Sequence, residues 1–281
     1  QAIQYAGFDD PKTALDEGFG RAIPFENLKL VAGIDLKTAL HNLNGNKSTP
    51  ITDKVTSVTF GLNKDHSDKV SGYEGTLTSV EQDAEVYTYY VPNATNSANY
   101  DVYVLADSAI YTPQDSKGLF QGMTSLTTVK TTNMDVSRTE NMTNMFRECS
   151  ALVDINVSAW KLSNATNMTS MFVNCSKLDN LKVSNWNVSN VTNMNSMFYD
   201  CNELTYLDVS NWGVSKCTGM KSMFYMCKEL GNLNVSGWDV SQVTTMTYMF
   251  RGCQTMTRID LSDWDVQNVK DMSYMFAFSK D

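Results

Sequence analysis

A 26-residue repeat in the C-terminal part of the chain constrains the fold more than any other feature. Tryptophan recurs at this interval in one ladder, which comprises Trp160, Trp186, Trp212, Trp238 and Trp264. Cysteine recurs at the same interval in a second ladder, which comprises Cys149, Cys175, Cys201, Cys227 and Cys253. Six copies of a Met-x-x-Met-Phe group follow the same step, the last of them at Met272, Met275 and Phe276. Such periodicity predicts an array of stacked units, because one unit cannot bury its apolar face alone.

Each unit opens on a short strand pattern. The unit from Leu204 to Glu229 reads LTYLDVSNWGVSKCTGMKSMFYMCKE, and its opening L-x-x-L-x-V is the strand signature of a leucine-rich repeat. Side chains alternate across a strand, so Leu207 and Val209 should face inward while Tyr206 and Asp208 face outward.

The rest of the unit predicts a wide coil that closes through a turn. Trp212 stands where the usual pattern has Asn or Cys, so we expect its indole to fill the core. Two Met residues one helical turn apart, with Thr218 as an N-cap, predict a short helix or 3₁₀ turn on the convex side. The expected fold class is an α/β solenoid with a leucine-rich-repeat-like parallel sheet, short convex helices or 3₁₀ turns, and an N-terminal α+β cap.

The composition changes near Gly118. All five prolines and both histidines precede it, whereas every Trp, Cys and Met follows it. Residues 100–125 form a degenerate first repeat, with Leu119 and Phe120 in the Met-Phe place. We therefore divide the chain into an N-terminal segment and cap, residues 1–99, and a solenoid, residues 100–281.

Local signals in the first part predict one helix and several strands. A helix is expected from Asp35 to Asn42, capped by Asp35, and strands are expected at Val55–Phe60, Val86–Val91 and Asp101–Ala106. We expect these strands to continue the sheet of the array. Residues 1–30 carry no pattern that we can assign.

The repeats resemble those of the BspA-like family of leucine-rich repeat surface proteins. LKVSNWNVSNVTNMNSMFYDC (Leu181–Cys201) and LNVSGWDVSQVTTMTYMFRGC (Leu233–Cys253) follow the family pattern almost throughout. GIDLKTALHNLNG and VTSVTFG resemble the segment that often precedes such repeats, so the resemblance covers roughly Gly33 to Asp281. It implies a secreted or cell-surface protein, with adhesion to host or matrix proteins in some members. It implies no catalytic residues.

The cysteines and the acidic segments do not predict a cofactor or a metal. Five of the six cysteines share one repeat position, so we expect buried, reduced thiols, and one thiol per coil without a nearby His disfavours zinc. One segment has the oxygen spacing of a calcium loop, at Asn63, Asp65, Ser67, Ser71 and Glu74. Asp68 stands where that loop needs Gly, so a solvated loop is the better interpretation.

Charge and motif content exclude several classes of function. A formal net charge of -9 disfavours nucleic acid and anionic membranes as partners. No apolar stretch approaches the roughly 18 residues that cross a bilayer, so we expect no membrane insertion. The array has no His and its Cys should be buried, so no nucleophile and base come together, and we expect no enzymatic activity. The expected protein is monomeric, and it is secreted or at the cell surface, although the 281 residues contain no signal or anchor pattern.

The outward strand positions form two columns that vary in charge and size. The first column holds Thr128, Asp154, Asn180, Tyr206, Asn232 and Arg258, and the second holds Lys130, Asn156, Lys182, Asp208, Asn234 and Asp260. From these we select Asp154, Asn180, Lys182, Tyr206, Asp208, Asn232, Arg258 and Asp260 as candidate binding residues for a host or matrix protein or a glycan. Two alternatives remain open: the columns are merely solvated, or the chain is a structural spacer without a ligand.

Overall fold

The computed structural model of the 281-residue chain describes residues 4–5, 28–29, 36–41, 51–66, 75–78 and 86–279. Its elements, in chain order, are β1 (Gln4–Tyr5), β2 (Leu28–Lys29), α2 (Leu36–His41), η2 (Thr52–Lys54), β3 (Val55–Leu62), α3 (Asn63–His66), β4 (Gly75–Thr78), β5 (Val86–Pro92), β6 (Tyr100–Ala106), β7 (Ile110–Tyr111), β8 (Thr128–Lys130), β9 (Met134–Asp135), β10 (Asp154–Ile155), β11 (Asn180–Leu181) and β12 (Tyr206–Leu207). The predicted helix and the three longer predicted strands are confirmed with small differences at their ends. Asp35, the predicted cap, lies outside the described residues.

One mixed sheet joins the N-terminal region to the repeats. Its strand order is β10-β8-β3-β6-β5-β4, with parallel pairing from β10 to β6 and antiparallel pairing from β6 to β4. The predicted boundary between residues 99 and 100 falls inside the β5–β6 hairpin. In the repeat register Val102 would lie beside Thr128, yet β3 takes that place, with Ser57 opposite Thr128. β6, the strand of the predicted first repeat, instead pairs with β3 along one edge and with β5 along the other.

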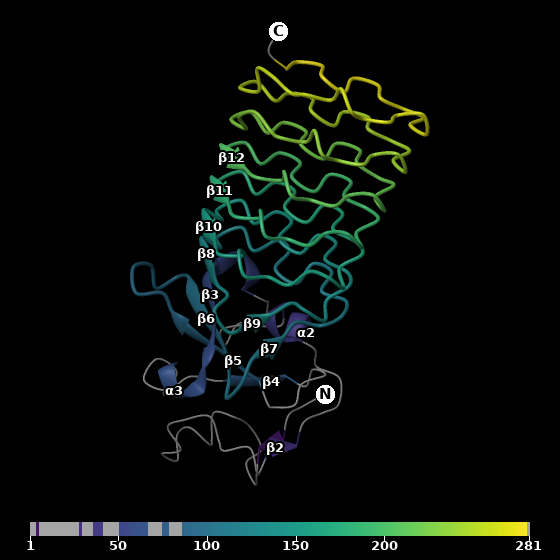
Figure 1. Cartoon of the computed structure of the whole chain (residues 1–281). Coiled ribbons are helices and arrows are strands. Elements are labelled where there is room, and N and C mark those ends of the chain that lie inside the picture. Colours follow the sequence, from purple (N-terminus) through teal and green to yellow (C-terminus); the bar gives the residue numbers. More distant parts are fainter. Residues whose placement is uncertain are drawn as a thin grey trace.

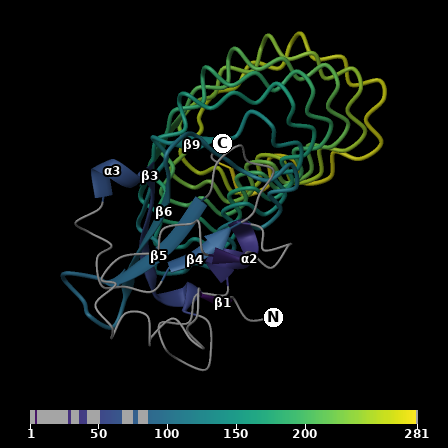
Figure 2. The same cartoon turned by 90° about the horizontal axis from the view of Figure 1, so that it is seen from below.

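The repeats form a stack of coils, whose strands β8 and β10 belong to this sheet (Figure 1). Seen along the stack, the coils lie over one another as similar closed outlines (Figure 2). A column of parallel bridges runs through the stack at 26-residue intervals and joins Asp115, Asn141, Asn167, Asn193, Gly219, Thr245 and Asp271. At the lower end α2 packs against the first coil, where Lys37 Nζ donates to Lys117 O over 2.6 Å.

The Met-Phe segments are turns whose backbone bonds alternate between two coils. Phe198 N donates to Met223 O of the next coil over 2.9 Å, whereas Met197 N donates to Met194 O of its own coil over 3.2 Å. Thr218 does not cap such a turn as expected, because its backbone N and its Oγ1 both donate to Thr192 O of the preceding coil, at 2.8 and 3.1 Å. Stacking therefore satisfies backbone groups that an isolated unit would leave open.

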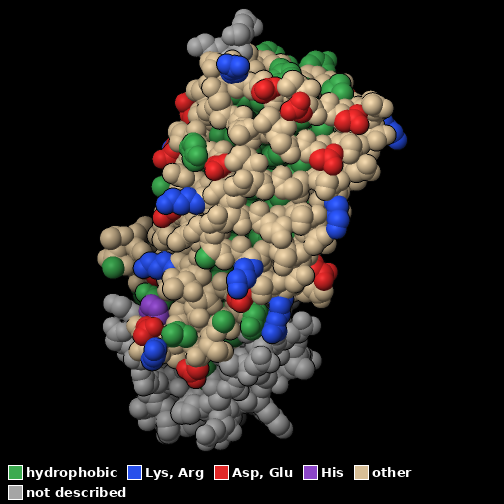
Figure 3. Space-filling view, viewed as in Figure 1, with side chains coloured by type: hydrophobic (Ala, Val, Ile, Leu, Met, Phe, Trp, Pro, Cys, Tyr) green, Lys and Arg blue, Asp and Glu red, His purple; other side chains and the backbone are tan. Residues whose placement is uncertain are grey.

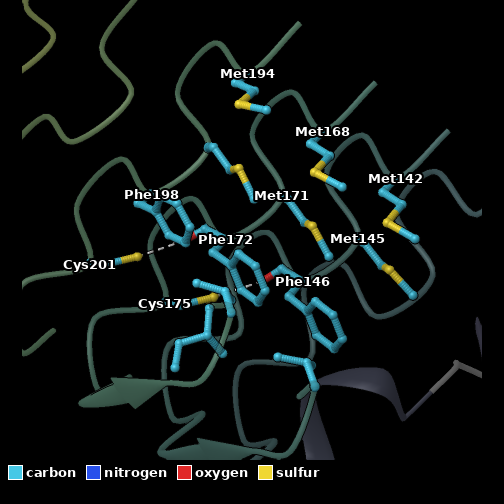
Figure 4. Close-up of a cluster of buried hydrophobic side chains, with 14 of the residues drawn as sticks. Met142, Met145, Phe146, Met168, Met171, Phe172, Cys175, Met194, Phe198 and Cys201 are labelled. Carbon is cyan, nitrogen blue, oxygen red and sulfur yellow. Dashed lines mark hydrogen bonds between the residues drawn. The ribbon is translucent and has the colours of Figure 1, made fainter. Parts of the chain in front are cut away.

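Columns of identical side chains fill the interior. The rings of Phe172 and Phe198 stack with centroids 5.7 Å apart, beside matching columns of Met and Cys (Figure 4). Cys201 Sγ donates to Phe172 O over 3.1 Å, and the other ladder cysteines repeat this bond one coil apart. All six cysteines are free and buried, as the repeat position predicted.

Candidate functional site

The strands β8, β10, β11 and β12 place the first outward column on one face of the coils. Tyr206 is 61% exposed while Leu207 beside it is 3% exposed, so the predicted alternation is confirmed here. Parallel pairing sets Asp154 opposite Thr128 and Asn180 opposite Tyr206, so each residue lies next to its counterpart one coil away. We call the surface made by the two outward columns the sheet face.

The sheet face is hollowed at its N-terminal end. A cavity of about 630 Å³ is lined by Ala109, Thr128, Val129, Lys130, Thr131, Thr132, Asn133, Met134, Asp135, Val136, Asp154, Asn156, Ala159, Trp160 and Lys161. The first members of both columns therefore meet in this hollow. Its exposed charges are the ammonium groups of Lys130 and Lys161 and the carboxylate of Asp154.

The hollow forms because the chain leaves the repeat path after β8. Thr131 Oγ1 donates to Asn156 O over 2.5 Å, and Asn133 Nδ2 donates to Gly61 O and Ser108 O at 3.1 and 2.8 Å. These bonds turn the segment toward β3 and the loop before β7. Met134, which occupies the Trp place of the repeat, is a smaller side chain than the indole found there in later coils.

The indole of Trp160 lacks the hydrogen bond that the other four Trp side chains make. Each of the other four Trp residues donates its Nε1 to the carbonyl of a Val that lies 29 residues earlier, as Trp186 does to Val157 O over 2.9 Å. Trp160 stacks on Trp186 with an interplanar angle of 3°, and the residue 29 positions before it is Thr131 in place of Val. That Nε1 is buried and has no hydrogen-bond partner among the described residues.

Part of the second column is occupied by local turns. Asp208 Oδ1 accepts the backbone N and the hydroxyl of Ser210, at 3.1 and 2.7 Å. Asp260 accepts the same two groups from Ser262, and these hydrogen bonds hold the pKa of the exposed Asp260 carboxyl below its usual value. These two candidate residues therefore shape the backbone of the face.

Asn232 also has a structural task. Its Oδ1 accepts the backbone N of Thr257 and of Arg258 in the next coil, at 3.0 and 2.9 Å. Here the Asn232 side chain takes the place of the backbone hydrogen bonds between strands, because β12 is the last strand among the described residues. The other candidates, which are Asp154, Asn180, Lys182, Tyr206 and Arg258, are exposed, and none of their side chains has a hydrogen bond within the described residues.

The cysteine thiols of the described residues are buried and free. Burial raises the pKa of Cys217 to about 11 and that of Cys253 to about 12, so these thiols stay protonated at neutral pH. Across the described ranges, no three His, Cys, Asp or Glu side chains gather as a metal site. Of the rejected calcium loop, Asn63 and Asp65 lie in α3, and the other three residues lie outside the described residues. No helix in the described part has the length and apolar character needed to span a membrane.

Sequence reasoning missed two groups of residues. Trp160 and Lys161 belong to the hollow, and the replacement of Trp by Met134 in the first full repeat was a signal for it. Four tyrosines on the turn side of the coils, described below, were hidden because they occupy two different repeat positions.

The comparisons with known proteins identify a family. A family model described as "Mycoplasma protein of unknown function, DUF285" matches residues 114–230 and again residues 200–281. Together these matches cover more than half of the chain and most of the coil stack. Comparisons with curated proteins and with solved structures gave no match.

Proposed function

The chain belongs to the DUF285 family, and from this premise we propose that it is a non-enzymatic binding protein of the secreted or cell-surface type. Its repeats are of the BspA-like, leucine-rich-repeat kind, and its coils form a solenoid whose sheet face recognises a protein or a glycan. The stacked parallel coils and the buried apolar columns support this proposal.

The observation that carries the proposal is the hollow at the N-terminal end of the sheet face. A concave site with a few convergent polar groups is the usual form of a recognition site. Lys130 and Lys161 supply donors, Asp154 supplies an acceptor, and none of the three is committed to another described residue. The mixed charge suits a polar ligand that is neutral or carries both signs.

A second candidate function, a structural spacer, is favoured by a different observation. Asp208, Asn232 and Asp260 use their side chains to hold turns and neighbouring coils. Polar residues whose role is to make such intramolecular hydrogen bonds can be explained without a ligand. The two functions therefore differ in whether the uncommitted residues of the face bind anything.

The test is a screen of the purified chain on a glycan array and on a panel of immobilised extracellular-matrix proteins. For any ligand found, the pair Lys130→Ala with Lys161→Ala tests the hollow, and the pair Tyr206→Ala with Arg258→Ala tests the far end of the face. We expect one pair to weaken binding by at least about 2 kcal/mol, because aromatic and Arg side chains and paired charges carry much of an interface's energy.

Two controls keep this result interpretable. Asp239→Asn removes an exposed charge outside both columns and keeps the turn, since Asn187 accepts the backbone N of Ser189 as Asp239 accepts that of Ser241. Gln242→Ala changes an exposed residue outside both columns. No binding in either screen would favour the spacer. Binding that is unchanged in both double variants would place the site away from the sheet face.

A further inference from the structure

Tyrosine side chains from four successive coils gather on the side of the stack that carries the Met-Phe turns. Tyr199 and Tyr225 stack with ring centroids 4.5 Å apart, and Tyr248 and Tyr274 stack at 5.5 Å. Tyr225 and Tyr248 meet edge to face at 6.2 Å, which joins the two pairs. We call these four residues the tyrosine strip.

One arginine stands among these rings. The guanidinium carbon of Arg251 lies 5.3 Å from the ring centroid of Tyr248 and 4.9 Å from that of Phe278. It also lies 5.7 and 5.8 Å from the rings of Tyr225 and Tyr274. Arg251 makes no ion pair or side-chain hydrogen bond within the described ranges, so its planar set of N–H donors is held by aromatic rings and remains available.

Arg147 shows what the same repeat position does without the strip. It lies 104 residues before Arg251, which is four repeats, and its Nε donates to Glu148 over 3.1 Å. The position equivalent to Glu148 in the coil of Arg251 is Gly252. The carboxylate partner is therefore missing where the aromatic rings are present.

The exposed parts of the strip favour a protein segment as the partner. Tyr274 is 63% exposed and Phe278 is 73% exposed, and Tyr, Phe and Arg are the residue types enriched at protein interfaces. Each ring of the strip has at least one face or edge against a neighbouring tyrosine ring. Ring edges carry positive partial charge, so they suit a hydrogen-bond acceptor group. A sugar ring would instead stack on an open aromatic face.

Charge limits how acidic that segment is. The chain has a formal net charge of -9, and the Asp200 carboxylate acts on Tyr199 from beside the strip. A polyanion would meet repulsion from these charges. A single carboxylate can reach Arg251 while its apolar neighbours contact Tyr274 and Phe278.

We propose that the tyrosine strip, with Arg251 and Phe278, is a docking surface for an apolar protein segment that carries one carboxylate, and that the Arg251 guanidinium binds this carboxylate. The surface lies on the turn side of the coils, separated from the sheet face by the core in which Phe198 meets Trp212 at 6.5 Å. It is independent of the sheet-face proposal, and either can hold without the other.

The test is selection of a random displayed peptide library on the full chain, followed by affinity measurement with synthetic peptides. We expect enriched peptides to share one Asp or Glu between apolar residues. Replacing that acid by its amide, or making Arg251→Gln in the protein, should weaken binding at least about tenfold, as expected for a lost charge-assisted contact at an interface centre. The matched control Arg147→Gln should leave the affinity within about twofold.

Circular dichroism of each variant separates loss of binding from loss of folding. If Arg251→Gln unfolds, Arg251→Lys keeps the charge without the planar donor set and should still weaken binding measurably. The proposal is overturned if no peptide is enriched, if the amide peptide or the Arg251 variant binds as well as the original, or if the enriched peptides are polyacidic. An equal loss of affinity with Arg147→Gln would also overturn it, because the loss would then come from the lower positive charge of the protein and not from the Arg251 site.

Discussion

At the scale of single residues, each coil holds two positions with left-handed backbone conformation. One is occupied by Gly118, Asn144, Ser170, Ser196, Ser222, Tyr248 and Tyr274, and the other by Gly122, Glu148, Asn174, Asp200, Met226, Gly252 and Phe278. A residue with a Cβ pays roughly 1–2 kcal/mol for this conformation. The bonds to the next coil offset that cost, because the neighbouring backbone groups would otherwise be unpaired.

The two glycines of the second position separate backbone strain from steric clash. Gly122 has φ +77 with open space at its Cβ position, whereas Gly252 has φ +78 and a Cβ there would meet Met226 Sδ. We expect Gly122→Ala to lower the free energy of unfolding by about 1 kcal/mol and Gly252→Ala by roughly 1 kcal/mol more. Urea unfolding measures both, and equal losses would mean that Met226 moves aside without cost.

At the scale of the coil, the Trp ladder couples each unit to its neighbours. Trp212 is 2% exposed and stacks on Trp186 at 6.1 Å and on Trp238 at 6.3 Å. Its Nε1 also donates to Val183 O over 3.1 Å. Trp264 is 9% exposed and stacks on Trp238 alone, because the last described coil has no further ring above it.

This difference predicts unequal costs along the ladder. Trp212→Ala should lower the free energy of unfolding by about 3–5 kcal/mol, since it opens a cavity between two coils. Trp264→Ala should cost distinctly less, because its site is partly open already. Thermal or denaturant unfolding of the two variants provides the comparison, and equal losses would contradict a stack held by contacts between neighbours.

At the scale of the whole molecule, the last described coil exposes apolar side chains. Met272 and Phe276 are 45% and 46% exposed, although their counterparts in earlier coils are buried. Hydrophobic side chains accordingly show at the upper end of the space-filling view, close to several acidic side chains (Figure 3). The buried thiols, by contrast, lie along the length of the interior. Because burial raises their pKa values, they make the stability of the fold depend on pH.

Raised thiol pKa values predict a loss of stability in alkali. Burial raises the pKa of Cys217 from its ordinary 9.0 to about 11, so the folded state keeps a proton that the unfolded state releases. Stability from this thiol is fully present below pH 9 and falls as pH rises toward 11, by up to about 1.4 kcal/mol per pH unit. Urea unfolding at several pH values measures the slope.

Cys217→Val is the matched variant for this prediction. Val191 and Val243 occupy the equivalent places in the neighbouring coils and are buried, so the substitution fits the fold. The variant should lose less stability than the original chain between pH 9 and 11, while other titrating groups contribute equally to both. An identical slope in the two proteins would show that the Cys217 thiol is reached by solvent.

The sequence by itself determined what each coil contains. Repetition of Trp, Cys, Met and Phe predicted their burial, and alternation around Leu207 predicted the exposed position of Tyr206, because both patterns follow from the local geometry of one unit. Tertiary structure alone decided how units meet. It placed β3 beside β8, opened the hollow next to Trp160, and brought the Tyr225 and Tyr248 positions together around Arg251. A repeat pattern records which positions share an environment within a coil, whereas contacts between different positions, and at the end of the array, depend on side-chain packing and hydrogen bonds that periodicity does not encode.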